Sequence, residues 1–396
     1  MRQHARHSLY AALVAVTCTV LGISGCGSDP EPVPYVPPRA FDDGMAVGAL
    51  DEVGIDAAIV ARAVTAIEEG RHGAVHSMLI VRDGKLVFEK YFPGHDFQYD
   101  AAGYRGKWIS HNRHSTHTVM SVGKSFVSAC IGIAVDHGFI ESVDQSVFDF
   151  LPEHQHLNTD GKGEITIEHL LTMTSGLQWL EWGASNTSPD SDLFKLWIDC
   201  EDQITCVLGK PMADAPGTSF VYNGGGMILL GEILKNASGM DIEDFSAQYL
   251  FEPLGIDAPE WKRFESGVAD ASGGFYITPR DMAKFGVLYL NNGVWDGAQI
   301  ISKEWVAWSA TTYEGNNRIK IPGEDAGRVG YTYTWWTNRV SGPDGKLDLY
   351  YANGWGGQKI IVIPDLEMVV VFTGGNYVSK NTHFRILGKH LLPAVD

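Results

Sequence analysis

Hydrophobic and polar positions form short strand-like runs near both ends of the chain, with longer apolar stretches between them. The dipeptide Asp83-Gly84 separates two of these runs and is typical of a tight β-hairpin. Strands at both ends predict one antiparallel sheet to which the two ends of the chain contribute, in an α/β (α+β) architecture. The predicted strands are residues 77–82, 85–91, 349–352, 359–363 and 368–373.

Helical patterns dominate the region between these strands. A mostly apolar, and therefore buried, helix is predicted over residues 121–138. Thr166 has the features of a helix cap, as does Thr278, which Pro279 follows at the first helical position. A final helix is predicted at about 382–392. We expect helices to flank the sheet, and a mainly helical subdomain to be inserted over about residues 115–270.

The N-terminal residues have the pattern of a targeting segment. A basic start precedes an apolar run over residues 9–23, and small residues then lead to Cys26. This pattern resembles the bacterial lipoprotein signal, which implies a signal peptide over 1–25 and a lipid on Cys26 that anchors the chain to a membrane. A plain signal peptide with a chance cysteine is the alternative. We expect an exported protein that faces the periplasm or the cell exterior.

The next segment is rich in proline, which predicts an extended tether over residues 26–40 and a folded body over residues 41–396. The formal net charge of −18 disfavours nucleic acid as a partner. Cys130 lies in the apolar helix and is expected to be a buried thiol. In an oxidising compartment Cys200 and Cys206 are close enough in sequence to form a disulfide.

The candidate chemistry begins with Ser121, which Lys124 follows three residues later. On a helix, side chains at this spacing share one face and lie within reach of each other. A serine hydroxyl becomes a useful nucleophile when a neighbouring base takes its proton, and a lysine amine in suitable surroundings is such a base. The motif therefore predicts acyl transfer without a histidine. The alternative is an ordinary helix with a serine cap and a solvated lysine.

Other segments accompany this motif, at residues 79–85, 170–177, 216–223, 272–281, 293–295 and 354–358. In this order, and over about residue 73 to the C-terminus, they resemble the serine β-lactamase and penicillin-binding-protein superfamily. The similarity is greatest to its branch of class C-like esterases and 6-aminohexanoate-dimer hydrolases. The resemblance implies a β-lactamase/transpeptidase-like fold with Ser121 as the nucleophile.

The resemblance also implies the partners of Ser121. Tyr222 matches the tyrosine that shares proton transfer with the lysine, although a half-buried structural aromatic is the alternative. The oxyanion hole would consist of the N–H groups of Ser121 and Gln358. Asn223 stands one position away from the asparagine of the family's second motif, so its place in substrate binding is open.

Trp355, Gly356 and Gly357 match the third motif, and the two glycines would let substrate approach the strand. Penicillin-recognising relatives carry lysine or histidine where this chain has Trp355, so neutral substrates are expected. Trp179 is a further candidate for the substrate cleft, together with Glu181 and Trp182, although packing in the core or at the rim explains each equally well.

Two other patterns are interpreted as structural. Ser272 lies in a sequence similar to a serine-protease motif, but the flanking residues differ. His111, His114 and His117 recur every three residues without nearby acidic ligands, so a solvated loop is expected and not a metal site.

Together these features predict an exported serine hydrolase that cleaves a small-molecule ester or amide without a cofactor or metal. One alternative is a D-Ala-D-Ala carboxypeptidase or a β-lactamase. Another is a non-catalytic lipoprotein that binds peptidoglycan. The sequence leaves the natural substrate and the oligomeric state open.

Overall fold

The computed structural model describes residues 35–183 and 188–396. The predicted signal peptide, Cys26 and most of the tether lie outside these residues, so the lipid anchor stays a prediction. Within the described part of the chain, no helix combines the length and the apolar character needed to cross a bilayer.

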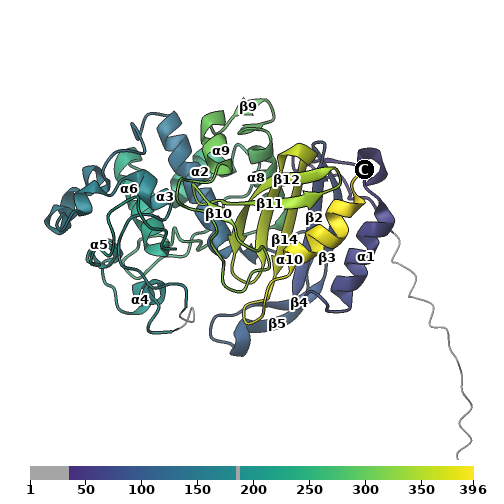
Figure 1. The fold of residues 1–396 in the computed structure, drawn as a ribbon, viewed down its shortest axis with the longest axis horizontal. Helices are drawn as coiled ribbons and strands as arrows, with labels where there is room; N and C mark the ends of the chain where they lie inside the picture. Colours follow the sequence, from purple (N-terminus) through teal and green to yellow (C-terminus); the bar gives the residue numbers. More distant parts are fainter. Residues whose placement is uncertain (1–34, 184–187) are drawn as a thin grey trace, which may run out of the picture.

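An eight-stranded sheet forms the centre of the fold (Figure 1). Its neighbouring strands are antiparallel, except that the two-residue edge strand β1 runs parallel to β3. N-terminal strand β2 pairs with C-terminal strand β14, with Leu79 opposite Val371, which confirms that both ends of the chain build one sheet. The strand order is β1 (Ala46–Val47), β3 (Lys85–Tyr91), β2 (Val75–Arg82), β14 (Met368–Gly374), β13 (Gln358–Ile363), β12 (Gly345–Gly354), β11 (Trp336–Gly342) and β10 (Gly330–Tyr331).

Helices cover both faces of this sheet. Helix α8 (Pro279–Leu290) packs on β13 and β14 so closely that a β-carbon on Gly286 would lie 2.5 Å from Val369. Phe372 instead contacts His383 of α10 (His383–Ile386), with ring centroids 4.7 Å apart. Val369 and Phe372 are three residues apart on one strand and so point to opposite faces. The two helices therefore lie on opposite sides of the sheet.

The predicted helix caps are confirmed. The Thr278 side chain accepts a hydrogen bond from the Asp281 backbone at the start of α8. Thr166 caps α3 (Ile167–Leu171) and forms a capping box with His169. Local sequence alone therefore determines where these two helices begin.

Helices from the middle of the chain form a second body, on the left in Figure 1. At its centre α2 (Gly123–Asp136) packs against α6 (Gly224–Ser238) and carries the buried thiol of Cys130. The other helices are α1 (Ala57–Glu68), which packs near the C-terminus, α4 (Asp192–Ile198), α5 (Gln203–Leu208), α7 (Ile242–Ser246) and α9 (Lys303–Ala310). Three small two-stranded sheets pair β4 (Pro93–Phe97) with β5 (Arg105–Ser110), β6 (His117–Thr118) with β7 (Tyr276–Ile277), and β8 (Val294–Trp295) with β9 (Ala298–Gln299).

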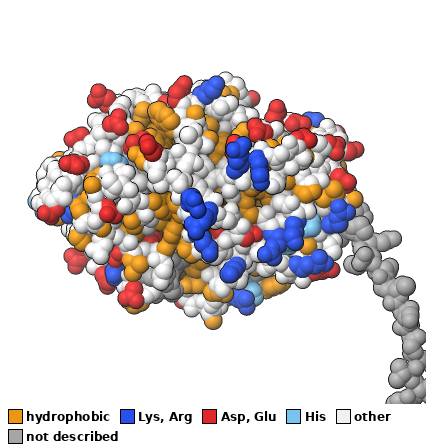
Figure 2. All heavy atoms as spheres, in the orientation of Figure 1, with side chains coloured by type: hydrophobic (Ala, Val, Ile, Leu, Met, Phe, Trp, Pro, Cys, Tyr) orange, Lys and Arg blue, Asp and Glu red, His pale blue; other side chains and the backbone are white. Residues whose placement is uncertain are grey.

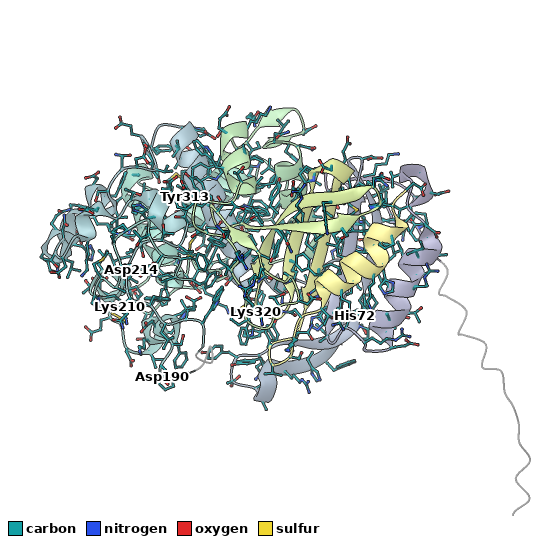
Figure 3. All side chains as sticks on the ribbon, in the orientation of Figure 1. His72, Asp190, Lys210, Asp214, Tyr313 and Lys320 are labelled. Carbon is teal, nitrogen blue, oxygen red and sulfur yellow. A yellow bond between two sulfur atoms is a disulfide. The ribbon has the colours of Figure 1, made fainter. Side chains whose placement is uncertain are left out.

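A disulfide and an ion-pair cluster hold the region around α4 and α5. Cys200 and Cys206 are joined, with Cα atoms 6.2 Å apart, which is the pairing that the sequence predicts. Asp192 lies 2.7 Å from the ammonium of Lys210 and 3.1 Å from that of Lys195. Figure 3 shows Lys210 at this end of the molecule. These contacts fix the segment that forms one wall of the site described below.

The surface charge is unevenly distributed. In the face shown in Figure 2, lysine and arginine side chains gather over the centre and right, while acidic side chains spread around the edge. The net negative charge of the chain therefore does not describe each part of its surface.

Candidate active site

Ser121 lies in a tight turn, η3 (Met120–Val122), that leads directly into α2. Met120 has a left-handed backbone conformation, with φ of 49°, which is uncommon for a residue with a side chain. Gly273 packs against this turn, and a β-carbon there would lie 1.9 Å from the Met120 carbonyl oxygen. Only a glycine fits at this point, so the 270s segment holds the turn that presents Ser121.

Lys124 is buried beside Ser121, with only 1% of its surface exposed. Its Nζ atom lies 2.9 Å from Ser121 Oγ and 2.7 Å from the carbonyl oxygen of Ser272. The helical spacing accounts for the first contact and the tertiary fold for the second. Ser272 therefore contributes its backbone to the site, while its hydroxyl donates to Asp270.

Tyr222 approaches the same pair from the segment that precedes α6. Its ring centroid lies 5.2 Å from Lys124 Nζ, and its ring stacks on Trp182 at 4.9 Å. Burial raises the pKa of Tyr222, and the charge of Lys124 together with hydrogen bonding to Ser121 opposes that shift. The structure thus brings Ser121, Lys124 and Tyr222 together from two distant parts of the sequence.

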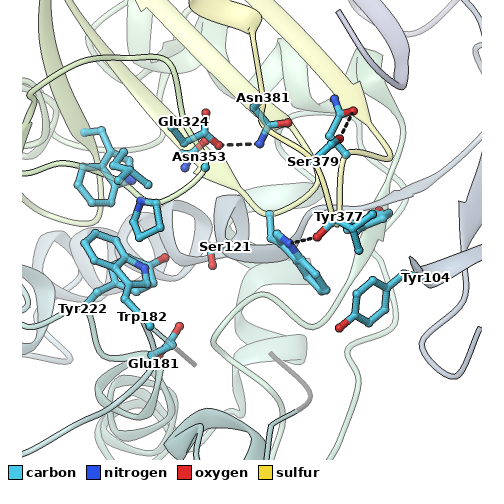
Figure 4. Close-up of a pocket in the computed structure, with 18 residues that line it drawn as sticks. Tyr104, Ser121, Glu181, Trp182, Tyr222, Glu324, Asn353, Tyr377, Ser379 and Asn381 are labelled. Carbon is cyan, nitrogen blue, oxygen red and sulfur yellow. Dashed lines mark hydrogen bonds between the residues drawn. The ribbon is translucent and has the colours of Figure 1, made fainter. Parts of the chain in front are cut away.

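Ser121 faces a first cavity of about 390 Å³. Figure 4 shows Tyr222, Trp182 and Glu181 on one side of Ser121, with Tyr377 and Tyr104 on the other. Amide and carboxylate groups form its upper wall, where Asn381 donates to Glu324 at 2.8 Å. The cavity therefore combines aromatic surface with amide and carboxylate groups, and it has no lysine or arginine among its described lining residues.

A second cavity of about 360 Å³ also reaches Ser121. It shares Glu181 and Trp355 with the first cavity, and Lys262 contributes a cation to it. Much of the rest of its lining is apolar. Three of these lining residues are exposed, with exposed fractions of 50% for Tyr99, 40% for Trp197 and 54% for Ile198. Two hollows that meet at one nucleophile can hold the two halves of a substrate on either side of the bond to be broken.

Glu181 is a buried carboxylate in the wall of both cavities. It accepts hydrogen bonds from the Trp179 indole at 2.9 Å and from the Gly224 backbone at 2.7 Å. Burial raises the pKa of Glu181, and the nearby charge of Lys124 opposes that rise. Trp179 lines neither cavity, so its observed contact is with Glu181 and not with the substrate space.

Trp355 lines both cavities. Its indole N–H donates to the Tyr377 carbonyl at 3.0 Å, and its ring meets Tyr104 edge to face at 4.6 Å. In residues 35–183 and 188–396 the backbone N–H groups of Trp355 and Ser121 have no protein acceptor. Both groups are therefore available to a substrate oxygen.

The structure places Gln358 away from the two cavities, unlike the sequence prediction. Gln358 is completely buried and pairs with Gly374, donating to its carbonyl at 2.7 Å and accepting from its N–H at 3.1 Å. It lines neither cavity. Its side chain joins β13 to β14 because an amide at this buried position needs partners.

Gly356 and Gly357 follow Trp355 in the chain and line neither cavity. A β-carbon on Gly356 would lie 2.3 Å from the Tyr377 ring, and one on Gly357 would lie 2.5 Å from the His383 ring. The expectation that these glycines leave room for substrate is therefore corrected, because protein rings fill that space.

Asn223 likewise has a structural position. Its side-chain oxygen accepts from the Gly226 backbone at 3.0 Å and caps α6, and only 3% of the residue is exposed. It lines neither cavity. Asn223 stands one position away from the asparagine of the family's second motif, and at this position its side chain does not reach the substrate space.

Two buried basic residues, Lys359 and Arg280, pair with acidic partners. Lys359 is fully buried, with Nζ 2.7 Å from Glu324. Arg280 pairs with Glu89 at 2.8 Å and with Asp43 at 2.6 Å. Among the described residues that line the first cavity, none is a lysine or an arginine.

The prediction of a solvated histidine loop is wrong for two of its three members. His111 and His117 are buried, whereas His114 is exposed. Their neighbour in space is His76 of β2, which belongs to no sequence motif. A hydrophobic strand gives no local signal that a histidine within it will meet two others.

Comparison with known proteins defines the family to which the chain belongs. The profile of the Beta-lactamase family matches residues 46–382, so the chain belongs to this family, whose members are serine hydrolases. This confirms the resemblance found in the sequence.

Individual relatives share a quarter or less of their residues with this chain. The 6-aminohexanoate-dimer hydrolase of Paenarthrobacter ureafaciens is 25% identical over 256 residues, which are 60% of this chain and 62% of that enzyme. A penicillin-binding protein from Bacillus halodurans has a similar fold, with a TM-score of 0.61, 20% identity, and coverage of 82% of this chain and 98% of that one. For a family VIII carboxylesterase the TM-score is 0.60, at 16% identity, with coverage of 84% and 95%.

Proposed function

We propose that this chain hydrolyses esters or amides through an acyl-enzyme on Ser121. The observation that carries the proposal is the 2.9 Å separation of Lys124 Nζ and Ser121 Oγ at the meeting point of two cavities. A buried lysine whose other neighbour is a carbonyl oxygen is held in place to exchange a proton with the serine.

In the proposed reaction Ser121 Oγ attacks the carbonyl carbon and its proton passes to the Lys124–Tyr222 pair. The bond to the leaving alcohol or amine then breaks, and the same pair returns the proton to the leaving group. Water attacks the acyl-enzyme by the reverse proton path, which releases the acid and restores the serine. The residues of the site supply every proton transfer, so no cofactor is required.

The oxyanion hole is reassigned from Gln358 to Trp355. The N–H groups of Ser121 and Trp355 have no protein acceptor in the described part of the chain, and both residues line the cavities. Two such donors stabilise the negative oxygen of the tetrahedral intermediate more than they stabilise the carbonyl. Backbone donors at these positions fit a range of acyl groups.

Support for neutral substrates comes from the same cavities. The first cavity has no basic side chain among its described lining residues, and Lys359 is occupied by Glu324. A substrate carboxylate placed there would lose its hydration without gaining a charge-assisted hydrogen bond, which is worth about 1.5–3 kcal/mol.

The site is also proposed to lie outside the cytoplasm on a protein that is anchored by a lipid on Cys26. Support for this part comes from the sequence alone, through the small residues before Cys26 and the proline-rich segment after it. Cys26→Ser is expected to release the protein from the membrane or to leave an uncleaved precursor. Unchanged membrane partition and unchanged mass would contradict the anchor.

A substrate panel tests the proposed activity. Purified protein is assayed with neutral p-nitrophenyl esters, short uncharged amides, nitrocefin and D-Ala-D-Ala peptides, beside Ser121→Ala and the matched control Ser188→Ala. We expect turnover of a neutral ester or amide that Ser121→Ala abolishes and Ser188→Ala leaves unchanged. Faster turnover of nitrocefin or a D-Ala-D-Ala peptide would favour the β-lactamase or peptidase alternative, and peptidoglycan binding without turnover would favour the non-catalytic one.

A further inference from the structure

Three histidines from separate elements form one buried cluster. His76 belongs to β2, His117 to β6, and His111 follows β5 directly. Their ring centroids are 4.2 Å apart for His76 and His111, 4.6 Å for His111 and His117, and 5.4 Å for His76 and His117. One nitrogen from each ring lies within 4.8 Å of the others. The fold therefore gathers three imidazoles that are up to 41 residues apart in sequence.

The cluster lacks the hydrogen-bond partners that buried imidazoles normally have. Both ring nitrogens of His76 and both of His111 are buried without a partner among the described residues. His117 differs, because the Ser115 backbone forms a hydrogen bond with it and its Nε2 lies 3.3 Å from the Thr373 hydroxyl. Native proteins rarely leave several polar atoms unsatisfied in one place. Each neutral imidazole has one nitrogen with a lone pair and one N–H, so a cation at the centre of the cluster would accept one lone pair from each ring.

The surroundings of the cluster disfavour charge on its rings. Burial lowers the pKa of His76, His111 and His117. A neutral imidazole offers one ring nitrogen with a free lone pair to a metal ion.

We propose that His76, His111 and His117 together bind one divalent transition-metal ion, with zinc as the best match. Zinc takes three imidazole nitrogens at about 2.0–2.1 Å and a water in the fourth position. The rings would have to draw together by roughly 1 Å to reach that geometry. Asp96, with a buried and unpartnered Oδ1, exerts its charge on His111, so it is suited to orient this ring from outside the ligand set.

Such an ion would connect two parts of the proposed active site without touching substrate. His117 is four residues before Ser121 on the segment that enters the catalytic turn. His111 ends the β4–β5 hairpin, whose Phe97 and Tyr104 line the cavities. The histidines are therefore positioning residues, and the metal would hold the cavity wall against the segment that carries the nucleophile.

Metal binding to the purified full chain tests the proposal directly. The protein is stripped with a chelator, and Zn²⁺ or Co²⁺ is then titrated with thermal unfolding and the visible Co²⁺ spectrum as readouts. We expect one equivalent to bind, the melting temperature to rise, and Co²⁺ to show the absorption bands of a low-coordinate site with imidazole ligands. His117→Gln and His76→Gln should each weaken binding at least tenfold, while the exposed control His114→Gln should bind as the original protein does.

Two results would overturn the proposal. The first is the absence of stoichiometric binding to the original protein, which is informative even if the glutamine variants fail to fold. The second is equal binding by the original protein and a folded His117→Gln variant, because the metal would then occupy exposed histidines such as His114 and His156. These readouts do not depend on the esterase assay, so the metal site and the proposed function can fail separately.

Discussion

At the scale of single residues, the chemistry depends on a proton that moves among three side chains. Lys124→Ala removes the amine beside Ser121, and Tyr222→Phe removes only a hydroxyl. Each change is expected to lower kcat/KM on the best ester by about 100- to 10,000-fold, the usual contribution of general acid–base catalysis. Circular dichroism checks that both variants fold. A folded variant within tenfold of the original rate would remove that residue from the mechanism.

Glu181 gives a second prediction at this scale, concerning stability and pH. Its folded pKa is raised by burial, so the stability that it contributes is present below its unfolded value of 4.5 and is lost as pH rises through the folded value. Glu181→Gln keeps an oxygen for the Trp179 and Gly224 donors and removes this titration. The variant should gain stability relative to the original protein between pH 5 and pH 8.

Denaturant unfolding across that pH range measures the effect. An equal stability difference at both pH values would contradict the role assigned to burial of Glu181. Glu168→Gln offers a control, because it makes the same chemical change at a carboxylate that is only partly buried.

At the scale of elements, the contact of α8 with the sheet depends on Gly286. A β-carbon there would lie 2.5 Å from Val369 and 2.8 Å from Ile360, so Gly286→Ala should destabilise the fold by about 1–3 kcal/mol. Gly388→Ala is the matched control, because a β-carbon there meets nothing within 4 Å and alanine favours helical structure. Urea unfolding of both variants measures this difference in stability. Equal stabilities would show that α8 can move away from the sheet at little cost.

Elements with local signals can be predicted from the sequence. Asp83 and Gly84 both have positive φ values, 51° and 71°, as the hairpin turn requires, and Thr278-Pro279 begins α8. The parallel pairing of β1 with β3 has no such signal, because it joins residues about forty positions apart. Local chemistry thus defines where elements begin and end, while packing determines which of them meet.

The residues of the site also divide into those with a local sequence signal and those placed by packing. The contact of Lys124 with Ser121 follows from helical spacing and is predictable, whereas the position of Gln358 depends on which face of a strand turns inward. Similarly, Asn223 becomes a helix cap because α6 begins directly after it. The histidine cluster joins three elements and lies beyond any local pattern.

At the scale of the whole molecule, the two cavities make a prediction about substrates. Neutral short-chain esters should exceed anionic analogues of the same length in kcat/KM by roughly one to two decades, since a carboxylate in the first cavity gains no cationic partner. Matched esters with and without a terminal carboxylate measure this ratio. A preference for the anionic ester would show that a cation such as Lys262 reaches the bound substrate.

Covalent labelling shows directly whether Ser121 carries the acyl group. The protein is treated with a fluorophosphonate or a slowly hydrolysed ester, digested, and mapped by mass spectrometry. We expect one adduct, on Ser121, that is absent from Ser121→Ala. An adduct on Ser125, Ser175 or Ser272, or full labelling of the Ser121→Ala protein, would contradict it.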